Sequence, residues 1–313
     1  MTLVSVSDTI YHDMANRINS IFTFDDRLEA CAVGDNGLLL TSSDAGASWK
    51  RGTVPTNSNL YAVSFPAQGS VGYACGDHGT ILKSEDNGRN WSVFDSGIDT
   101  DLRGVEFPAN ARVGFVSGAK GTIRRTDNGG QTWTAQPVPC DGKLMDICFP
   151  VDDLTGYAVG LGCTILKTTN GGEHWFSQSG NIVNALPGAS FNAVHFPADD
   201  VIGFVVTSRG RVLFTPDGGE VWRPLPMESQ LPPLYSLDMR HDTQGGFVCG
   251  ARGTLLQTGD GGENWTQQYP GTDKDLFSVR FFVDGNIGIL GGDEMTLLQC
   301  TDGGSCWGAA IIN

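Results

Sequence analysis

The sequence predicts an all-β fold, a seven-bladed β-propeller with four antiparallel strands in each blade. Three observations predict it: a sevenfold repeat, a turn motif in every repeat, and short apolar runs separated by turn residues. All seven tryptophans of the 313-residue chain belong to the repeat: Trp49, Trp91, Trp133, Trp175, Trp222, Trp265 and Trp307. Successive tryptophans are 42, 42, 42, 47, 43 and 42 residues apart. A period within about 20–50 residues is typical of solenoids and propellers.

A turn motif precedes each tryptophan at fixed distances. The seventh residue back is Ser or Thr in six repeats and Cys300 in the last, the fifth is Asp or Asn, and the third is always Gly. Asp and Asn side chains bond nearby backbone in tight turns, Gly accepts a positive φ, and Trp packs as a large apolar anchor. We expect this turn to join two strands in every repeat.

Each repeat also contains three strand signals before this turn. In the second repeat they are the runs 60–65, 71–75 and 80–84, and the strand that carries Trp91 follows. Apolar runs separated by Gly, Pro, Asn and Asp indicate antiparallel strands, and no segment after residue 17 has the pattern of a helix of about ten or more residues. Four strands in seven repeats predict one propeller domain over residues 18–313, closed into a ring because no capping repeats are present.

Residues 1–17 form a separate N-terminal segment before the first repeat. Residues 3–7 alternate apolar and polar side chains, as a strand does, and correspond by offset to the fourth strand of a preceding blade. Because chain ends meet in a closed propeller, we expect this segment to dock near residues 308–312 and help to close the ring. A free N-terminal tail is the alternative.

The turn Ser/Thr-x-Asp/Asn-x-Gly-x-x-Trp resembles the Asp-box, or bacterial neuraminidase repeat. The longer unit, seen in residues 107–133 and 149–175, resembles repeats of the photosystem II assembly and stability-factor family. The resemblance covers residues 18–313 and implies a propeller in which the seven Asp-boxes are structural. For function it implies a non-enzymatic scaffold that binds a protein or peptide. The same repeats occur in sialidases, xyloglucan-degrading hydrolases and sugar-binding proteins.

Sialidases of that superfamily carry an Arg-Ile-Pro motif near the N-terminus. The nearest match is Arg17-Ile18-Asn19, which lacks the proline, so we expect no sialidase activity.

The composition excludes several classes of partner. The formal net charge is −15 and the pI is near 4.5, which disfavours a nucleic acid or an anionic membrane surface. No signal peptide and no apolar run long enough to span a membrane are present, so we expect a cytoplasmic protein, or an exported one if a leader has been removed. The eight cysteines show no zinc spacing, and no metal or cofactor is expected. Cys300 and Cys306 flank the last turn, and either free thiols or a cross-strand pair fits them.

The first strand of each repeat should line the central channel, and its fifth position varies most. That position is occupied by Phe22, Ser64, Glu106, Cys148, His195, Asp238 and Arg280. Strand alternation predicts that the first, third and fifth positions face the same side, where the third position is Asp146 in one repeat. Cys148, His195 and Asp238 come from consecutive blades, and a thiol, an imidazole and a carboxylate in this order are the parts of an activated nucleophile. Glu106 and Arg280 flank them.

Two interpretations of this ring stay open. One is a solvated channel wall. The other is a small-molecule or glycan site, with catalysis of the hydrolase, lyase or cyclase type by Glu106, Cys148, His195 and Asp238.

Charged turns distinguish the blades on the face opposite the Asp-boxes. The turn between the second and third strands carries Lys120, Arg209 and Arg252 in blades three, five and six, and acidic residues in blades seven, one and two. Arg103 and Arg211 add to the basic side. A face polarised in this way suits an oriented protein partner, whereas scattered surface charge is the alternative.

The second positions of the inner strands should form the rim of the channel, where Tyr61, Asn192, Tyr235 and Phe277 are candidates for ligand contact. Arg280, Asp146 and Arg103 complete the candidate ligand-binding set. The fifth repeat has a longer loop over residues 180–190, which we expect to lie over this face. The leading interpretation is a non-enzymatic propeller that binds a protein or peptide here.

Overall fold

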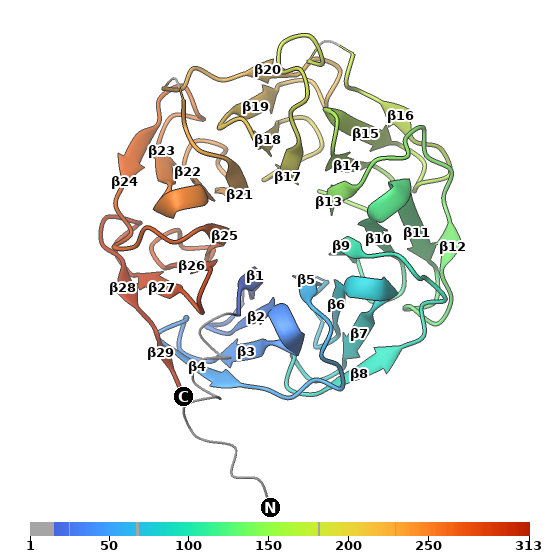
Figure 1. Cartoon of the computed structure of the whole chain (residues 1–313), viewed down its shortest axis with the longest axis horizontal. Coiled ribbons are helices and arrows are strands. Elements are labelled where there is room, and N and C mark those ends of the chain that lie inside the picture. Colours follow the sequence, from blue (N-terminus) through green and yellow to red (C-terminus); the bar gives the residue numbers. More distant parts are fainter. Residues whose placement is uncertain (1–15, 25, 67–68, 181, 229) are drawn as a thin grey trace, which may run out of the picture.

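The predicted seven-bladed propeller is confirmed. A computed structural model describes residues 16–24, 26–66, 69–180, 182–228 and 230–313, and its seven sheets stand in a ring around a central channel (Figure 1). Blades 2 to 7 are each one contiguous stretch of chain, and in every blade the strands run outward in sequence order. The innermost strands are β1 (Ile18–Thr23), β5 (Leu60–Ser64), β9 (Leu102–Glu106), β13 (Leu144–Cys148), β17 (Phe191–His195), β21 (Leu234–Met239) and β25 (Leu276–Phe281).

The second strands form the core of the blades, since every residue in them is buried. They are β2 (Ala30–Gly34), β6 (Gly72–Gly76), β10 (Gly114–Gly118), β14 (Gly156–Gly160), β18 (Gly203–Thr207), β22 (Gly246–Gly250) and β26 (Gly288–Gly292). The third strands are β3 (Leu39–Ser42), β7 (Ile81–Ser84), β11 (Thr122–Thr126), β15 (Thr164–Thr168), β19 (Val212–Thr215), β23 (Leu255–Thr258) and β27 (Leu297–Cys300).

The fourth strands are the shortest ones in blades 3 to 7. They are β4 (Ser48–Arg51), β8 (Trp91–Phe94), β12 (Thr134–Ala135), β16 (Phe176–Ser177), β20 (Arg223–Pro224), β24 (Thr266–Gln268) and β28 (Gly308–Ala309). In four blades the turn after the second strand is a 3₁₀ turn: η1 (Asp35–Gly37), η2 (Asp77–Gly79), η3 (Ala119–Gly121) and η4 (Ala251–Gly253).

The ring closes at its C-terminal end with a strand that was not predicted. β29 (Ile311–Ile312) pairs in parallel with β4, so blade 1 has five strands rather than four antiparallel ones. The Ile311 amide donates to the Ala47 carbonyl at 3.0 Å, and the Asn313 amide to the Trp49 carbonyl at 2.8 Å. Residues 1–15 of the predicted closing segment lie outside the described residues. Of the rest, Arg17 pairs with Asp293 of blade 7 at 2.8 Å.

Deleting residues 311–313 is expected to lower the free energy of unfolding by about 1–3 kcal/mol. The loss is small because Ile311 and Ile312 are 63 % and 37 % exposed, so the strand contributes mainly backbone hydrogen bonds, each worth about 1 kcal/mol net. Urea unfolding measures it, and hydrogen exchange should show faster opening between β1 and β25. The control is Ile311→Ser with Ile312→Ser, which keeps the backbone; an equal loss in that variant would contradict the hydrogen-bond explanation.

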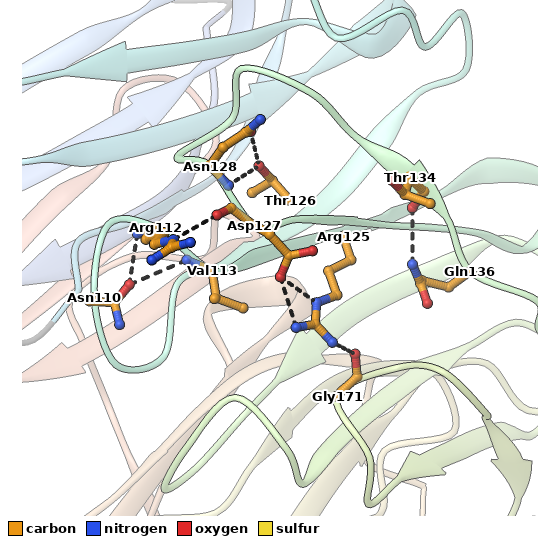
Figure 2. Close-up of polar contacts among 10 residues, drawn as sticks. All are labelled: Asn110, Arg112, Val113, Arg125, Thr126, Asp127, Asn128, Thr134, Gln136 and Gly171. Atoms are coloured by element: carbon orange, nitrogen blue, oxygen red, sulfur yellow. Dashed lines mark hydrogen bonds and ion pairs between the residues drawn. The ribbon is translucent and has the colours of Figure 1, made fainter.

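The Asp-box turns have the geometry that the motif predicts. In blade 3 the Thr126 hydroxyl donates to Asn128 at 3.0 Å (Figure 2). The same hydroxyl accepts the Gly130 amide at 2.9 Å. Asn128 Oδ1 in turn accepts the Thr132 amide at 2.9 Å. The same bonds recur in blade 1, where the Trp49 indole N–H also donates to the Gly46 carbonyl at 3.0 Å. The box therefore fixes its own turn, as the sequence indicates.

Long polar side chains tie one blade to the next. Arg125 Nη1 donates to the Gly171 carbonyl of the following Asp-box at 2.7 Å (Figure 2). Equivalent bonds reach the next box from Lys167, Gln257 and Gln299, the last one from blade 7 to blade 1. These contacts were not predicted, but they have a sequence signal, since each donor directly precedes the Ser, Thr or Cys of its own box.

The predicted alternation along the inner strands is wrong. In all seven blades a β-bulge follows the first residue, as where Leu60 pairs with Gly76 but Ala62 with Cys75. A bulge inserts one residue and reorients the side chains that follow. The first position is therefore fully buried in every blade, together with the fourth, and does not share a side with the third and fifth.

Candidate functional site at the channel mouth

A cavity of about 290 Å³ lies at the mouth of the channel, walled by the inner strands of all seven blades. The second position of every inner strand lines it, at Asn19, Tyr61, Arg103, Met145, Asn192, Tyr235 and Phe277. Deeper lining residues include Asp146, Ser236, Ser278 and Arg280. All seven residues of the predicted ligand-binding set thus face one space, because the bulge turns the second position inward.

The first wall of the cavity is a fixed aromatic platform. The Tyr61 hydroxyl donates to Asp77 Oδ1 at 2.7 Å, and Asn59 holds the other carboxylate oxygen at 2.8 Å. The guanidinium carbon of Arg103 lies 3.6 Å from the centre of the Tyr61 ring. Burial, and then the bond to Asp77, raise the pKa of Tyr61. The ring therefore remains a neutral surface on which a cation stacks.

The second wall lies across the ring, in blades 6 and 7. The Tyr235 and Phe277 rings are stacked with centroids 5.0 Å apart, and the Tyr235 hydroxyl donates to Asp275 at 3.4 Å. The Arg17 guanidinium lies 5.2 Å from the Phe277 centroid and is neutralised by Asp293. This wall offers apolar area with polar groups at its margin.

Two asparagines of the rim have structural roles, the predicted Asn192 and the unpredicted Asn19. The side-chain amides of Asn19 and Asn192 donate to the Leu60 and Leu234 carbonyls of the next blade, at 2.9 and 2.7 Å. They hold neighbouring inner strands together, which leaves less of their hydrogen-bonding capacity for a ligand.

The floor of the cavity combines Arg280 with the carboxyl group of Asp146, and Glu106 interacts with both charges without lining the cavity. Arg280 Nη1 donates to the Val279 and Leu237 carbonyls at 2.9 and 3.3 Å. Asp146 accepts the Ile147 and Val194 amides at 2.9 and 3.0 Å. Burial raises the pKa of Asp146 to about 6. Burial and the Asp146 charge raise the pKa of Glu106 to about 8, an effect that Arg280 partly opposes.

The predicted nucleophile is not assembled. Asp238 Oδ2 accepts the Phe281 amide at 2.7 Å, and His195 Nε2 lies 3.1 Å from the Met239 carbonyl. Within the described chain, no hydrogen bond joins His195 to Cys148 or to Asp238. Burial, followed by the Glu106 and Asp146 charges, holds the pKa of Cys148 far above its usual range, and burial lowers the pKa of His195. These side chains bond backbone of the next blade instead of one another.

The four catalytic candidates Glu106, Cys148, His195 and Asp238 do not line the cavity, although Arg280 at the equivalent fifth position of its inner strand does. All eight cysteines are free, Cys300 and Cys306 included. Across the described residues, no three His, Cys, Asp or Glu side chains gather to hold a metal ion, and no described helix is long and apolar enough to span a membrane.

The charged turns surround the cavity on the same face. In every blade the amide that opens the turn donates to the carbonyl of the residue before the inner strand, as from Asp77 to Asn59 at 3.0 Å. Lys120, Arg209 and Arg252 are exposed, whereas Arg211 is half-buried and donates to the Glu228 carbonyl at 2.8 Å. The acidic turns are engaged internally, through Asp35 with Asn19, Asp77 with Tyr61 and Asp293 with Arg17.

The turns share one backbone shape in six blades. Two consecutive residues have a positive φ there, and Lys120 and Arg252 both have a φ of 58°. Blade 5 differs, because Arg209 is not left-handed and Thr207 replaces the Gly that ends the second strand elsewhere. A side chain at that Gly would collide with backbone, at Gly76 with the Asn59 carbonyl.

The longer loop of the fifth repeat packs inward at several points. Ile182 and Ala189 are buried against Phe191, and the Cys163 thiol lies 3.0 Å from the Leu186 carbonyl. Val183 stays exposed.

Comparison with known proteins identifies the family. The family model described as "Photosynthesis system II assembly factor YCF48" matches residues 7–85, 131–237 and 233–312. No curated protein matches the chain. The solved structure described as "YCF48 bound to D1 peptide" is similar, with 22 % sequence identity and a TM-score of 0.72 over 92 % of this chain and 94 % of that one.

YCF48 from Cyanidioschyzon merolae has 17 % identity and a TM-score of 0.73, covering 92 % of this chain and 96 % of that one. The GH74 enzyme of Niastella koreensis has 14 % identity and a TM-score of 0.73, covering 94 % of this chain and 54 % of that one. At these identities the three structures agree with this chain in fold alone. The family model, in contrast, matches well over half of the sequence, and the protein belongs to the photosynthesis system II assembly factor YCF48 family.

Proposed function

We propose that this propeller is an assembly factor that binds a peptide segment of a protein partner at the channel mouth. The observation that carries the proposal is the cavity, which has aromatic walls on both sides and arginines between them. Fixed aromatic rings give a peptide large contact area at little cost in side-chain entropy.

The size of the cavity supports a peptide rather than a large ligand. Sites for small molecules commonly measure about 300–1,000 Å³, so a cavity of about 290 Å³ holds only a few groups. Further contacts would come from the surrounding face, where Lys120, Arg209 and Arg252 are exposed. Exposed charges of one sign steer a partner and set its orientation. D1 is the first partner to test, since a solved relative is described as bound to a D1 peptide.

The test is binding of fluorescein-labelled peptides tiled along D1, followed by anisotropy. We expect Phe277→Ala to weaken the best peptide roughly thirtyfold, because loss of a central aromatic contact costs about 2 kcal/mol. Lys120→Glu, Arg209→Glu and Arg252→Glu together should slow association severalfold at low salt.

Two matched controls separate the site from general surface effects. Tyr269→Ala removes an aromatic ring that is 82 % exposed and does not line the cavity. Arg89→Glu reverses an exposed charge in the Asp-box turn of blade 2. Wild-type protein that binds no peptide, or that loses as much affinity in Tyr269→Ala as in Phe277→Ala, would contradict the proposal.

A further inference from the structure

We propose that the cavity recognises the free C-terminal carboxylate of its peptide, and that Arg103 and Arg280 bind this group. The inference rests on the proposed peptide-binding function and specifies the chemical group that enters the cavity.

Arg103 is oriented but has no acidic partner among the described residues. Its guanidinium is held against the Tyr61 ring at 3.6 Å, and that ring is itself fixed by Asp77. In the described part of the chain Arg103 makes no ion pair, and its Nε atom is buried without an acceptor. Buried donors of a charged group are normally satisfied, because leaving them unpaired costs free energy. A guanidinium that is stacked and unpaired on the wall of a cavity is prepared for an anion.

Arg280 is in a similar state on the floor. Among the described residues only Nη1 finds acceptors, and these are the neutral carbonyls of Leu237 and Val279. No carboxylate of the described residues lies within ion-pairing distance of Arg280. Asp146 and Glu106 interact with its charge from further away, and the Asp146 oxygens accept two backbone amides. Arg17 shows the contrast, because Asp293 at 2.8 Å already neutralises it.

The shape of the site selects the end of a chain. The second positions of all seven inner strands wall the cavity, so a peptide enters along the ring axis with one end. An N-terminal ammonium would meet two guanidinium groups, and the carboxyl group of Asp146 on the same floor already accepts two backbone amides. A C-terminal carboxylate offers two oxygens that match the planar donors of the guanidinium groups. The overall charge of −15 gives no general attraction for anions, so the two arginines must supply it locally. An Asp or Glu side chain is the competing source of a carboxylate.

The experiment uses the D1 peptides described above, each made as the free acid and as the C-terminal amide, with the label on the N-terminus. We expect the acid form of a binding peptide to bind the full-length protein tenfold or more tightly than the amide. Arg103→Gln and Arg280→Gln should each reduce this preference, because they weaken binding of the acid form more than binding of the amide form. Arg103→Lys keeps the charge but not the planar guanidinium, and it should retain part of the preference for the acid form. Arg89→Gln is the control and should change neither form.

The outcomes separate this inference from the proposed function. Equal affinity of the acid and amide forms would overturn recognition of the C-terminal carboxylate and leave peptide binding intact. Tight binding of amides that depends on an internal Asp or Glu of the peptide would have the same consequence. An acid preference that survives in both glutamine variants would overturn the assignment to Arg103 and Arg280. Failure of every peptide in both forms would overturn the proposed function itself. The comparison of acid with amide on wild-type protein stands even if a variant fails to fold.

Discussion

Replacing Trp49 with alanine is expected to lower the free energy of unfolding by about 3–5 kcal/mol, the usual cost of removing a large buried aromatic side chain. Trp49 is 0 % exposed and packs with Ile289 and Phe282 of blade 7. Its carbonyl also accepts the Asn313 amide of the closing strand. The substitution therefore opens a cavity where the first and last blades meet, and urea unfolding measures the loss.

Trp265→Ala is the matched control in blade 6. Trp265 occupies the same position of its Asp-box but is partly exposed, and its buried indole nitrogen has no partner among the described residues. We expect less than half of the loss seen for Trp49→Ala. Equal losses would show that the box, and not burial between blades 7 and 1, sets the cost.

Glu106 is expected to make the protein less stable as the pH rises. Burial raises the pKa of Glu106 to about 8 from an ordinary value of 4.5, and the groups that face it are Asp146, Arg280 and Cys148. The folded state therefore binds more protons than the unfolded state between these two values, and the free energy of unfolding falls across that window. Glu106→Gln should abolish the fall above pH 6 and stabilise the protein at pH 8–9 by about 1–3 kcal/mol.

The size of this effect is limited because Glu106 is only partly buried, so that water reduces the penalty of its charge. Urea unfolding from pH 4 to 9 measures it, with the exposed Glu220→Gln as the control. In Glu106→Gln the free energy of unfolding should still fall with rising pH below pH 6, since burial also raises the pKa of Asp146 to about 6. If the free energy of unfolding of Glu106→Gln fell as steeply above pH 6 as that of the wild type, the assignment to Glu106 would be refuted.

The repeat made the fold and the rim of the site predictable. Because the seven tryptophans recur at nearly equal spacing, every strand can be located by counting residues from the tryptophan of its repeat. An error in one repeat is corrected by comparison with the other six. The same offsets find Tyr61, Arg103, Tyr235 and Phe277 as equivalent positions, and the structure places them around one cavity. Periodicity predicts equivalence well, because equivalent residues must occupy equivalent places in a ring.

The bulge was missed because strict alternation was assumed. The inner strands have apolar residues at both the first and the fourth position, for example Leu60 and Val63, and both are buried. In a regular strand these positions face opposite sides. Their shared apolar character was therefore the available signal of an irregularity between them.

Equivalence in sequence does not show whether side chains from neighbouring blades meet. Cys148, His195 and Asp238 stand at one position in consecutive blades, but the backbone of the next blade supplies the nearest partner for His195 and Asp238. Sequence offsets specify position along a strand and carry no information on the spacing between strands of different sheets. The pairing of β29 with β4 was missed for the same reason, since its partner is distant in the chain.

Because the turns share one backbone shape, the side chains that they present on the channel-mouth face can be exchanged. Asn36, His78, Lys120, Arg252 and Glu294 all have a φ of 53–58°, yet they differ in size and charge. Since one backbone accepts all five, exchanging these residues between blades should alter what the face attracts without altering how the ring folds. Valine or isoleucine would be excluded, because β-branched residues are strained at positive φ. These turn positions are therefore suitable sites for a combinatorial library from which new binding specificities can be selected.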